Sequence, residues 1–101
     1  MYVKIHNSGA HGGNRNVVAV CDEDLLGKVL KGDNIEFKVT ESFYKGEIKS
    51  EQEIILILKK SSNINLVGKM SIAAGIKANV ITEENVIMMG GIPHAQAFTL
   101  G

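Results

Sequence analysis

The residues that could do chemistry lie in two short segments far apart in the chain. Cys21 and Asp22 follow an apolar run, and His94 and Gln96 follow the only proline, Pro93. A cysteine with a histidine as its base could form a nucleophilic pair. The alternatives are a buried, unreactive Cys21 and a His94 that hydrogen-bonds a backbone carbonyl. Because proline restricts the chain before His94, we expect a functional imidazole, partly exposed in a concavity.

Metal binding has little support in the sequence. The chain has three histidines and one cysteine but no Cys-x-x-Cys or His-Glu-x-x-His motif, and His6 and His11 are separated by a glycine-containing loop. We therefore predict no metal and no cofactor. The same loop, residues 7–15, with Arg15 could hold an anion through its backbone N–H groups, or it could simply connect two strands.

Length and composition indicate one ordinary globular domain, residues 1–101. Apolar residues make up 45% and charged residues 22%, and the net charge is zero, which argues against a strongly basic nucleic-acid module. A single cysteine excludes an internal disulfide and suits a reducing compartment. The longest apolar run, 54–58, is too short to span a bilayer. We expect a soluble, cytoplasmic protein with no membrane association.

Charge is unevenly distributed along the chain. Residues 45–77 carry six lysines against three glutamates, a local charge of +3. This region could be a solvated helical surface or a patch that binds an anionic partner. Its lysines are Lys45, Lys49, Lys59, Lys60, Lys69 and Lys77.

The first half of the chain has the pattern of strands. Residues 2–6 alternate in character and 16–21 are almost continuously apolar, which predicts an antiparallel hairpin. Residues 22–27 predict a short helical turn that Asp22 caps. Residues 35–40 alternate as a half-buried strand does, and 42–49 form a connector.

The second half predicts two helices. Ser50 and Glu53 match a capping box, so a helix runs from there to about Lys60. Apolar residues at helical spacing predict a second helix over 64–74, and Gly75 is expected to end it in the left-handed conformation.

The chain is expected to end in two more strands, 86–89 and 95–100, separated by a bend at Gly90 and Gly91. The order β-β-β-α-α-β-β indicates an α+β fold, a small, mostly antiparallel sheet with two helices packed on one face.

Four segments resemble the small archaeal family known as domain of unknown function 424. They are 18–28 (VAVCDEDLLGK), 43–44 (FY), 65–69 (NLVGK) and 91–96 (GIPHAQ). The resemblance implies an archaeal source and an association with translation, but no established activity. It marks Cys21, Asp22, Asn65, Gly68, Pro93, His94 and Gln96. With Lys69 from the third segment, our candidate binding residues are Cys21, Asp22, Asn65, Lys69, His94 and Gln96.

The leading hypothesis is a small module that binds RNA or a ribonucleoprotein through about three to five phosphate contacts at most. The five aromatic residues do not form an RNA-recognition-motif pattern. The alternative is a small-ligand-binding protein or enzyme with a cleft around Cys21 and His94. A third hypothesis is a protein–protein adaptor whose C-terminal segment extends a sheet or forms a dimer.

Overall fold

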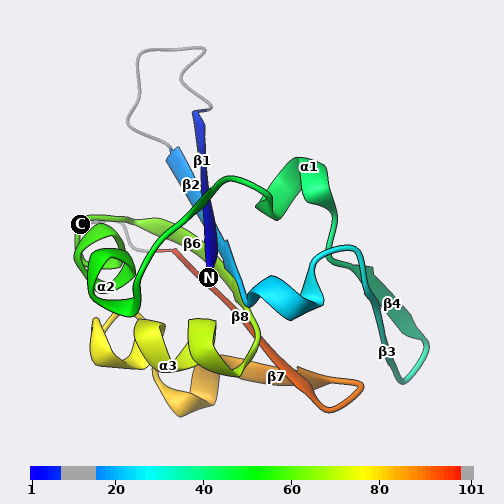
Figure 1. Cartoon of the computed structure of the whole chain (residues 1–101). Coiled ribbons are helices and arrows are strands. Elements are labelled where there is room, and N and C mark those ends of the chain that lie inside the picture. Colours follow the sequence, from blue (N-terminus) through cyan, green and yellow to red (C-terminus); the bar gives the residue numbers. More distant parts are fainter. Residues whose placement is uncertain (8–15, 99–101) are drawn as a thin grey trace.

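A six-stranded sheet forms the centre of the molecule, in the order β5-β1-β2-β6-β8-β7. The structure, a computed structural model, describes residues 1–7 and 16–98 (Figure 1). The strands are β1 (Tyr2–Asn7), β2 (Asn16–Cys21), β5 (Glu47–Ile48), β6 (Asn63–Val67), β7 (Val86–Met89) and β8 (Ile92–Phe98). Within this sheet β2 and β6 are parallel and the other pairs are antiparallel, so the predicted α+β class is confirmed.

The remaining elements lie on the two faces of this sheet. They are α1 (Glu41–Tyr44), α2 (Glu51–Lys59), α3 (Lys69–Lys77), the 3₁₀ turns η1 (Glu23–Leu25) and η2 (Glu83–Asn85), and the hairpin of β3 (Val29–Gly32) with β4 (Ile35–Lys38). Figure 1 shows α2 and α3 on one side of the sheet, with α1 and the β3–β4 hairpin on the other. No helix of residues 1–7 and 16–98 is long and apolar enough to cross a membrane.

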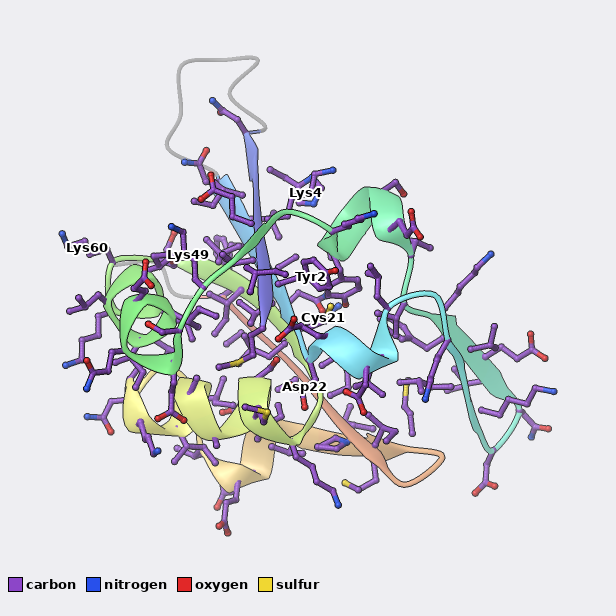
Figure 2. All side chains as sticks on the ribbon, viewed as in Figure 1. Tyr2, Lys4, Cys21, Asp22, Lys49 and Lys60 are labelled. Atoms are coloured by element: carbon purple, nitrogen blue, oxygen red, sulfur yellow. The ribbon has the colours of Figure 1, made fainter. Side chains whose placement is uncertain are left out.

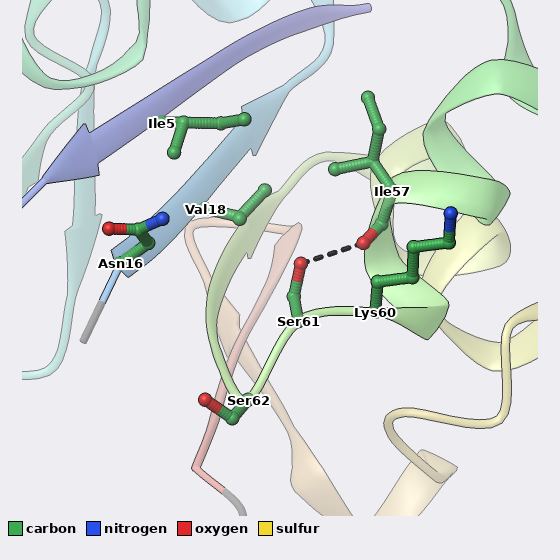
Figure 3. A pocket seen from close by; sticks show the side chains of 7 residues that line it. All are labelled: Ile5, Asn16, Val18, Ile57, Lys60, Ser61 and Ser62. Atoms are coloured by element: carbon green, nitrogen blue, oxygen red, sulfur yellow. Dashed lines mark hydrogen bonds between the residues drawn. The ribbon is translucent and has the colours of Figure 1, made fainter. Parts of the chain in front are cut away.

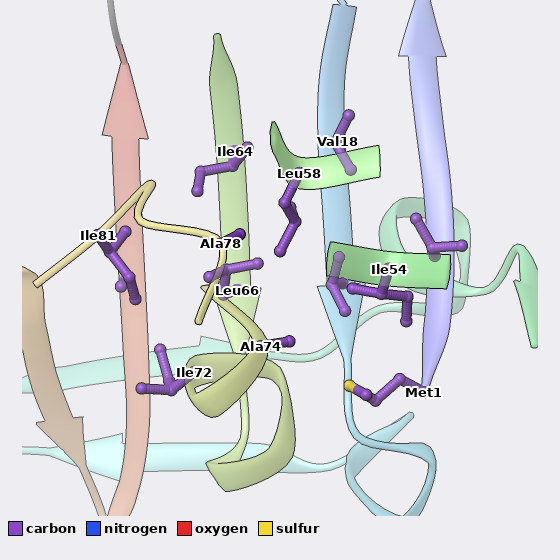
Figure 4. Packing of buried hydrophobic residues seen from close by; sticks show 13 residues of the cluster. Met1, Val18, Ile54, Leu58, Ile64, Leu66, Ile72, Ala74, Ala78 and Ile81 are labelled. Carbon is purple, nitrogen blue, oxygen red and sulfur yellow. The ribbon is translucent and has the colours of Figure 1, made fainter. Parts of the chain in front are cut away.

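The larger hydrophobic core lies between the sheet and helices α2 and α3 (Figure 4). Alternate strand residues point to this face, so Val18, Ile64 and Leu66 meet apolar side chains of the two helices. Ile54 and Leu58 of α2 are completely buried here. The predicted packing of two helices on one face is therefore confirmed.

A smaller core covers the opposite face. Ala19, Cys21 and Val67 point from β2 and β6 toward Leu30 of β3 and Tyr44 of α1. Because both faces are covered, the two middle strands β2 and β6 are buried along most of their length.

Several predicted elements are present. The β1–β2 hairpin forms, and α2 begins with the predicted capping box, in which Ser50 Oγ accepts from Glu53 N at 3.3 Å. Gly90 and Gly91, with φ of 57° and 81°, form the two-residue turn between β7 and β8, which is the type I′ geometry of tight hairpins.

The predicted second helix over residues 64–74 is wrong. Residues 63–67 form β6, and α3 begins only at Lys69. Ile64 to Val67 are all buried, because Leu66 packs against the helices and Val67 against the opposite layer. A short apolar run of this kind fits a helix or a doubly covered strand equally well by periodicity alone. Gly68, with φ of 108°, separates strand from helix.

Gly75 does not end a helix. It lies within α3 and is fully surrounded, since a Cβ there would lie 2.4 Å from Leu66 Cδ1. The residue in the left-handed conformation is Asn79, with φ of 59°, one residue beyond the C-cap Ala78. The glycine therefore provides close helix–sheet packing rather than a helix stop.

Other boundaries also differ from the prediction. Strand β3 was not expected, the connector over 42–49 contains part of α1 and all of β5, and the strand predicted over 35–40 ends at Lys38. The last strand starts at Ile92 rather than at residue 95. Pro93 fits there because β6 pairs only with residues from His94 onward, so proline's missing N–H interrupts no hydrogen bond to β6.

Candidate functional site

Three polar side chains meet in the smaller core, at the oxygen of one amide. Tyr44 Oη of α1 donates to Asn65 Oδ1 of β6. His94 Nε2 of β8 lies 3.2 Å from the same oxygen, and because an amide oxygen can only accept, Nε2 is the donor. The group therefore links a covering helix to two neighbouring strands through a single acceptor.

The sheet register brings these residues together. Asn65 pairs with Gln96, and Val67 pairs with His94, so Asn65 and His94 lie diagonally on one face of adjacent strands. The phenol ring of Tyr44 reaches them because α1 packs over β1 and β2, with its N-cap Thr40 accepting from Phe43 N at 3.3 Å.

His94 is buried, not partly exposed, so our expectation for its environment was wrong. Its exposed fraction is 7%, and the ring of Phe37 in β4 lies 4.7 Å from the imidazole, centroid to centroid. Burial lowers the pKa of His94 below its ordinary value of 6.5. A buried, hydrogen-bonded neutral imidazole of this kind fits a structural role.

Cys21 and His94 share a face of the sheet but are separated by a strand. Cys21 pairs with Val67, which pairs with His94, so two strand spacings of ~4.8 Å place their backbones about 10 Å apart. The thiol is completely buried, and this burial, with the nearby Asp22 carboxylate, raises the pKa of Cys21 to about 11. An activated cysteine has the opposite properties, so the geometry does not support a nucleophilic pair.

Asp22 caps α3 instead of the short turn that follows it. Its Oδ1 accepts from Ser71 N at 2.9 Å and Ser71 Oγ at 2.8 Å, and its Oδ2 accepts from Met70 N at 3.0 Å. The turn η1 has no side-chain cap. Figure 2 shows Asp22 at the end of β2, beside the start of α3. The carboxylate fits closely there because Gly68 has no side chain, and a Cβ on it would lie 2.3 Å from Asp22 Cγ.

The two remaining candidates, Lys69 and Gln96, are exposed, and Gln96 lies beside the buried group because it pairs with Asn65. Lys69 is the first residue of α3. Gln96 follows His94 on β8, where it points to the same face as Phe98, and the half-buried Asn63 pairs with Phe98 across the β6–β8 ladder. We call Asn63, Gln96 and Phe98 the open platform. Phe98 is 59% exposed there.

The lysines of residues 45–77 do not gather into one patch. Lys49 pairs with Glu47 and Glu53, and Lys77 pairs with Glu51 at 2.9 Å. Lys60 precedes the first residue of β6 and Lys69 follows its last, so these two lie at opposite ends of that strand. Lys49 and Lys60 both project from the surface beside α2 (Figure 2). Only Lys59 and Lys60 lie close in sequence to the open platform.

Pockets over the described residues lie away from the buried group. One of about 380 Å³ lies at the end of α2, where Ser61 Oγ donates to Ile57 O at 2.7 Å (Figure 3). Others of about 310 Å³ and 540 Å³ lie beside β5 and beyond α3. Neither Cys21 nor His94 lines any of the three. The pocket at the end of α2 is lined by Ile5, Asn16, Val18, Ile57, Lys60, Ser61 and Ser62. The pocket beside β5 is lined mainly by Val3, Lys4, Gly46, Glu47 and Lys49. The pocket beyond α3 is lined by Ile76, Asn79, Ile81, Thr82, Glu83 and Glu84.

Metal ligands do not cluster in the described part of the chain, where no three His, Cys, Asp or Glu side chains converge. The Nε2 atom of His6 instead lies 2.7 Å from Phe43 O, and the imidazole ring stacks on the Phe43 ring. His11, Arg15 and the predicted anion-binding loop lie outside the described residues, apart from Asn7.

Residues that the sequence analysis did not single out complete the site. Tyr44 and Phe37 enclose the Asn65–His94 pair, and Ser71 completes the cap. The sequence predicts Phe43 and Tyr44 as packing anchors of the connector over 42–49, and both do pack in the smaller core, but it predicts no contact with Asn65. No local pattern predicts that residues 44, 65 and 94 meet, because their contact depends on sheet topology.

A model of the family described as Protein of unknown function (DUF424) matches residues 10–100. The chain belongs to this family. The resemblance found in four short sequence segments is thereby confirmed.

The DUF424 fold also appears in a crystal structure. The structure, titled as that of an uncharacterized conserved protein from Methanopyrus kandleri, is 27% identical to this DUF424 chain, with a TM-score of 0.77. The match covers 96% of this chain and 89% of the other. No curated protein sequence matches the DUF424 chain. These findings support the family and the fold and assign no activity.

Proposed function

We propose that the protein is a small RNA-binding module that holds single-stranded RNA on the open platform. The observation that carries this proposal is the exposure of Phe98 on a sheet face, next to the amide side chain of Gln96. Exposed aromatic rings on a sheet stack with unpaired bases, and amide groups hydrogen-bond their edges.

Charge near the platform supports the proposal. Lys59 and Lys60 are exposed and lie just before Asn63, and no carboxylate of residues 1–7 and 16–98 pairs with either. They can contact phosphates of a strand whose bases reach Phe98. The pocket beside Lys60, which Asn16, Ser61 and Ser62 help to line, lies at the same end of the sheet but on the face that α2 covers, so it is not part of the platform. The rest of the surface is balanced in charge, so binding is expected to be weak and salt-sensitive.

Filter binding to ribosomal RNA and transfer RNA at rising salt tests the proposal. Phe98→Ala removes a stacking surface worth about 1–3 kcal/mol, a loss of about 5- to 150-fold in affinity. The double variant Lys59→Ala, Lys60→Ala should reduce the salt slope by about 1.4, since each single-strand phosphate contact contributes about 0.7.

Leu56→Ala is the matched control, because Leu56 is 61% exposed on α2 and is not part of the platform. It should bind RNA as the unmodified protein does. The proposal is wrong if RNA is not retained even at low salt, or if Phe98→Ala binds as tightly as Leu56→Ala.

A further inference from the structure

Strand β7 is an edge strand of the sheet, and β3 lies against its Gly90 end without pairing with it. It pairs with β8 on one side, and no described strand pairs with its other side. Its sequence, Val86-Ile87-Met88-Met89, contains no charge and no proline. Ile87 is 61% and Met88 58% exposed, on opposite faces of the sheet. Natural proteins usually protect edge strands with charges, prolines or a covering element.

The opposite edge of the sheet differs in this respect. Strand β5 has only two residues, one of which is Glu47, and Lys49 follows directly. A short, charged edge is a poor template for another strand. The comparison singles out β7 as the edge that is suited to further pairing.

Charge of opposite sign lies at the two ends of β7. Glu83 and Glu84, both exposed, immediately precede the strand. At the other end, a Cβ on Gly90 would lie 2.9 Å from Lys31 O, so the backbone of Lys31 is adjacent.

Lys69 lies at the same end of β7 as Lys31. It follows Gly68, whose N donates to Pro93 O at 2.9 Å, and Pro93 pairs with Met88. Neither the glutamates nor the two lysines form an ion pair with any residue of 1–7 and 16–98.

From this arrangement we infer that a second copy of the chain pairs with β7, strand against strand in antiparallel orientation. A two-fold axis through the middle of β7 places the acidic end of each copy opposite the basic end of the other. The interface is therefore self-complementary, which a strand with one kind of charge at both ends could not be.

The acidic end also offers a receptor for the basic end of the partner. A pocket of about 540 Å³ there is lined by Ile76, Ile81 and Thr82 together with the two glutamates. Apolar walls and a carboxylate rim suit a lysine side chain, which buries its methylene stem and keeps its ammonium at the charged edge.

Sedimentation velocity over a hundredfold concentration range tests this dimer. The unmodified protein should sediment as two chains. The double variants E83K/E84K and K31E/K69E should each sediment as one chain, because each places like charges at both ends of the interface. An equimolar mixture of the two variants should again sediment as two chains, since each then meets opposite charge at both ends.

The control K59E/K60E makes the same change of charge far from β7 and should remain dimeric. Ile87→Lys, at an exposed edge position, should give single chains without altering either charged end. A monomeric unmodified protein overturns the inference, as does a dimer that survives Ile87→Lys and both charge changes. Each variant is first checked for an unchanged urea midpoint. A mixture of the two charge variants that stays monomeric also counts against the two-fold arrangement.

Discussion

Asn65 holds the two layers of the smaller core together at one oxygen atom. Its Oδ1 accepts from Tyr44 in the covering layer and from His94 in the sheet, and all three side chains are buried. Burial, together with the nearby Cys21 thiol, raises the pKa of Tyr44 above its usual range. A buried polar group with no partner costs about 1–3 kcal/mol of folding free energy. Removing one of the three side chains would therefore destabilise the protein by leaving another without its hydrogen bond.

The burial of His94 leads to a dependence of stability on pH. Its folded-state pKa is lowered, so below its ordinary value of 6.5 the unfolded chain binds the proton more readily. The free energy of unfolding should therefore be constant above this pH, decrease as the pH falls toward the folded-state pKa, and level off below it. Urea midpoints measured between about pH 5 and 8 check this.

His94→Gln provides the reference for that measurement. It should unfold more easily by about 1–3 kcal/mol at neutral pH, and the difference from the unmodified protein should shrink as the pH falls. A midpoint unchanged by His94→Gln, or a constant difference at every pH, would exclude a buried neutral imidazole.

Cys21 should be inert in the folded protein. Its sulfur is fully buried and burial raises its pKa to about 11, so little thiolate exists at neutral pH and reagents cannot reach it. We expect no reaction with a thiol reagent under native conditions and complete reaction in concentrated urea. Rapid labelling under native conditions would contradict this prediction and would support the hypothesis that Cys21 is a reactive nucleophile.

At the scale of elements, Asp22 and Gly68 together form the start of α3. Asp22→Ala should destabilise the protein by about 1–2 kcal/mol, because two backbone N–H groups lose their acceptor. Gly68→Ala should also destabilise it, since the residue has φ of 108° and its Cβ would strike the carboxylate. Urea unfolding measures both.

The double variant separates these two causes. Because a Cβ at residue 68 would collide with the carboxylate, Gly68→Ala should cost less in the Asp22→Ala background than alone. Strictly additive changes would mean that only the backbone strain at residue 68 matters.

Gly75 provides another test of helix α3. Alanine there gains about 1 kcal/mol of helix propensity but collides with Leu66, and overpacking of this kind costs about 1–3 kcal/mol. We therefore expect net destabilisation in thermal melts, reduced when Leu66→Val removes the colliding methyl group. Asn79→Gly, at the true helix end, should stabilise by up to about 1 kcal/mol. A stabilising Gly75→Ala would contradict the close packing.

The elements that the sequence predicted correctly carry local signals. The capping box defines α2, alternation defines β1, and the paired glycines define the β7–β8 turn. Strand β6 lacked such a signal, because its conformation depends on layers contributed by distant parts of the chain. The sequence did not predict that Asp22 caps α3 for the same reason, since Asp22 and Met70 lie 48 positions apart in the chain.

At the scale of the whole molecule, folding is expected to need no metal. Both cores are apolar, and no metal-binding cluster occurs among the described residues. A chelator should leave the circular dichroism spectrum and the melting temperature unchanged. Release of a stoichiometric metal together with loss of the spectrum would contradict this prediction.

The candidate site could be predicted from the sequence only in part, because its contacts depend on the order of the strands in the sheet. Sequence segments marked Asn65 and His94, and these two do meet. Cys21 lies in the same core without a hydrogen bond to them, and Gln96 pairs with Asn65 but is exposed, whereas Asp22 and Lys69 lie at the start of α3. A linear sequence identifies which residues are unusual, but the sheet order determines which of them become neighbours.

The single parallel pair at the centre of the sheet has a kinetic consequence. Val18 pairs with Ile64, so a crossover of about 45 residues must close before β2 and β6 share hydrogen bonds. Closing such a loop costs about 3 kcal/mol of chain entropy. The β1–β2 and β7–β8 hairpins have no such barrier, because each joins neighbouring segments. We therefore expect the slow step of folding to be the docking of the two hairpin-containing halves, and the bond from Asp22 to α3 to form only after it.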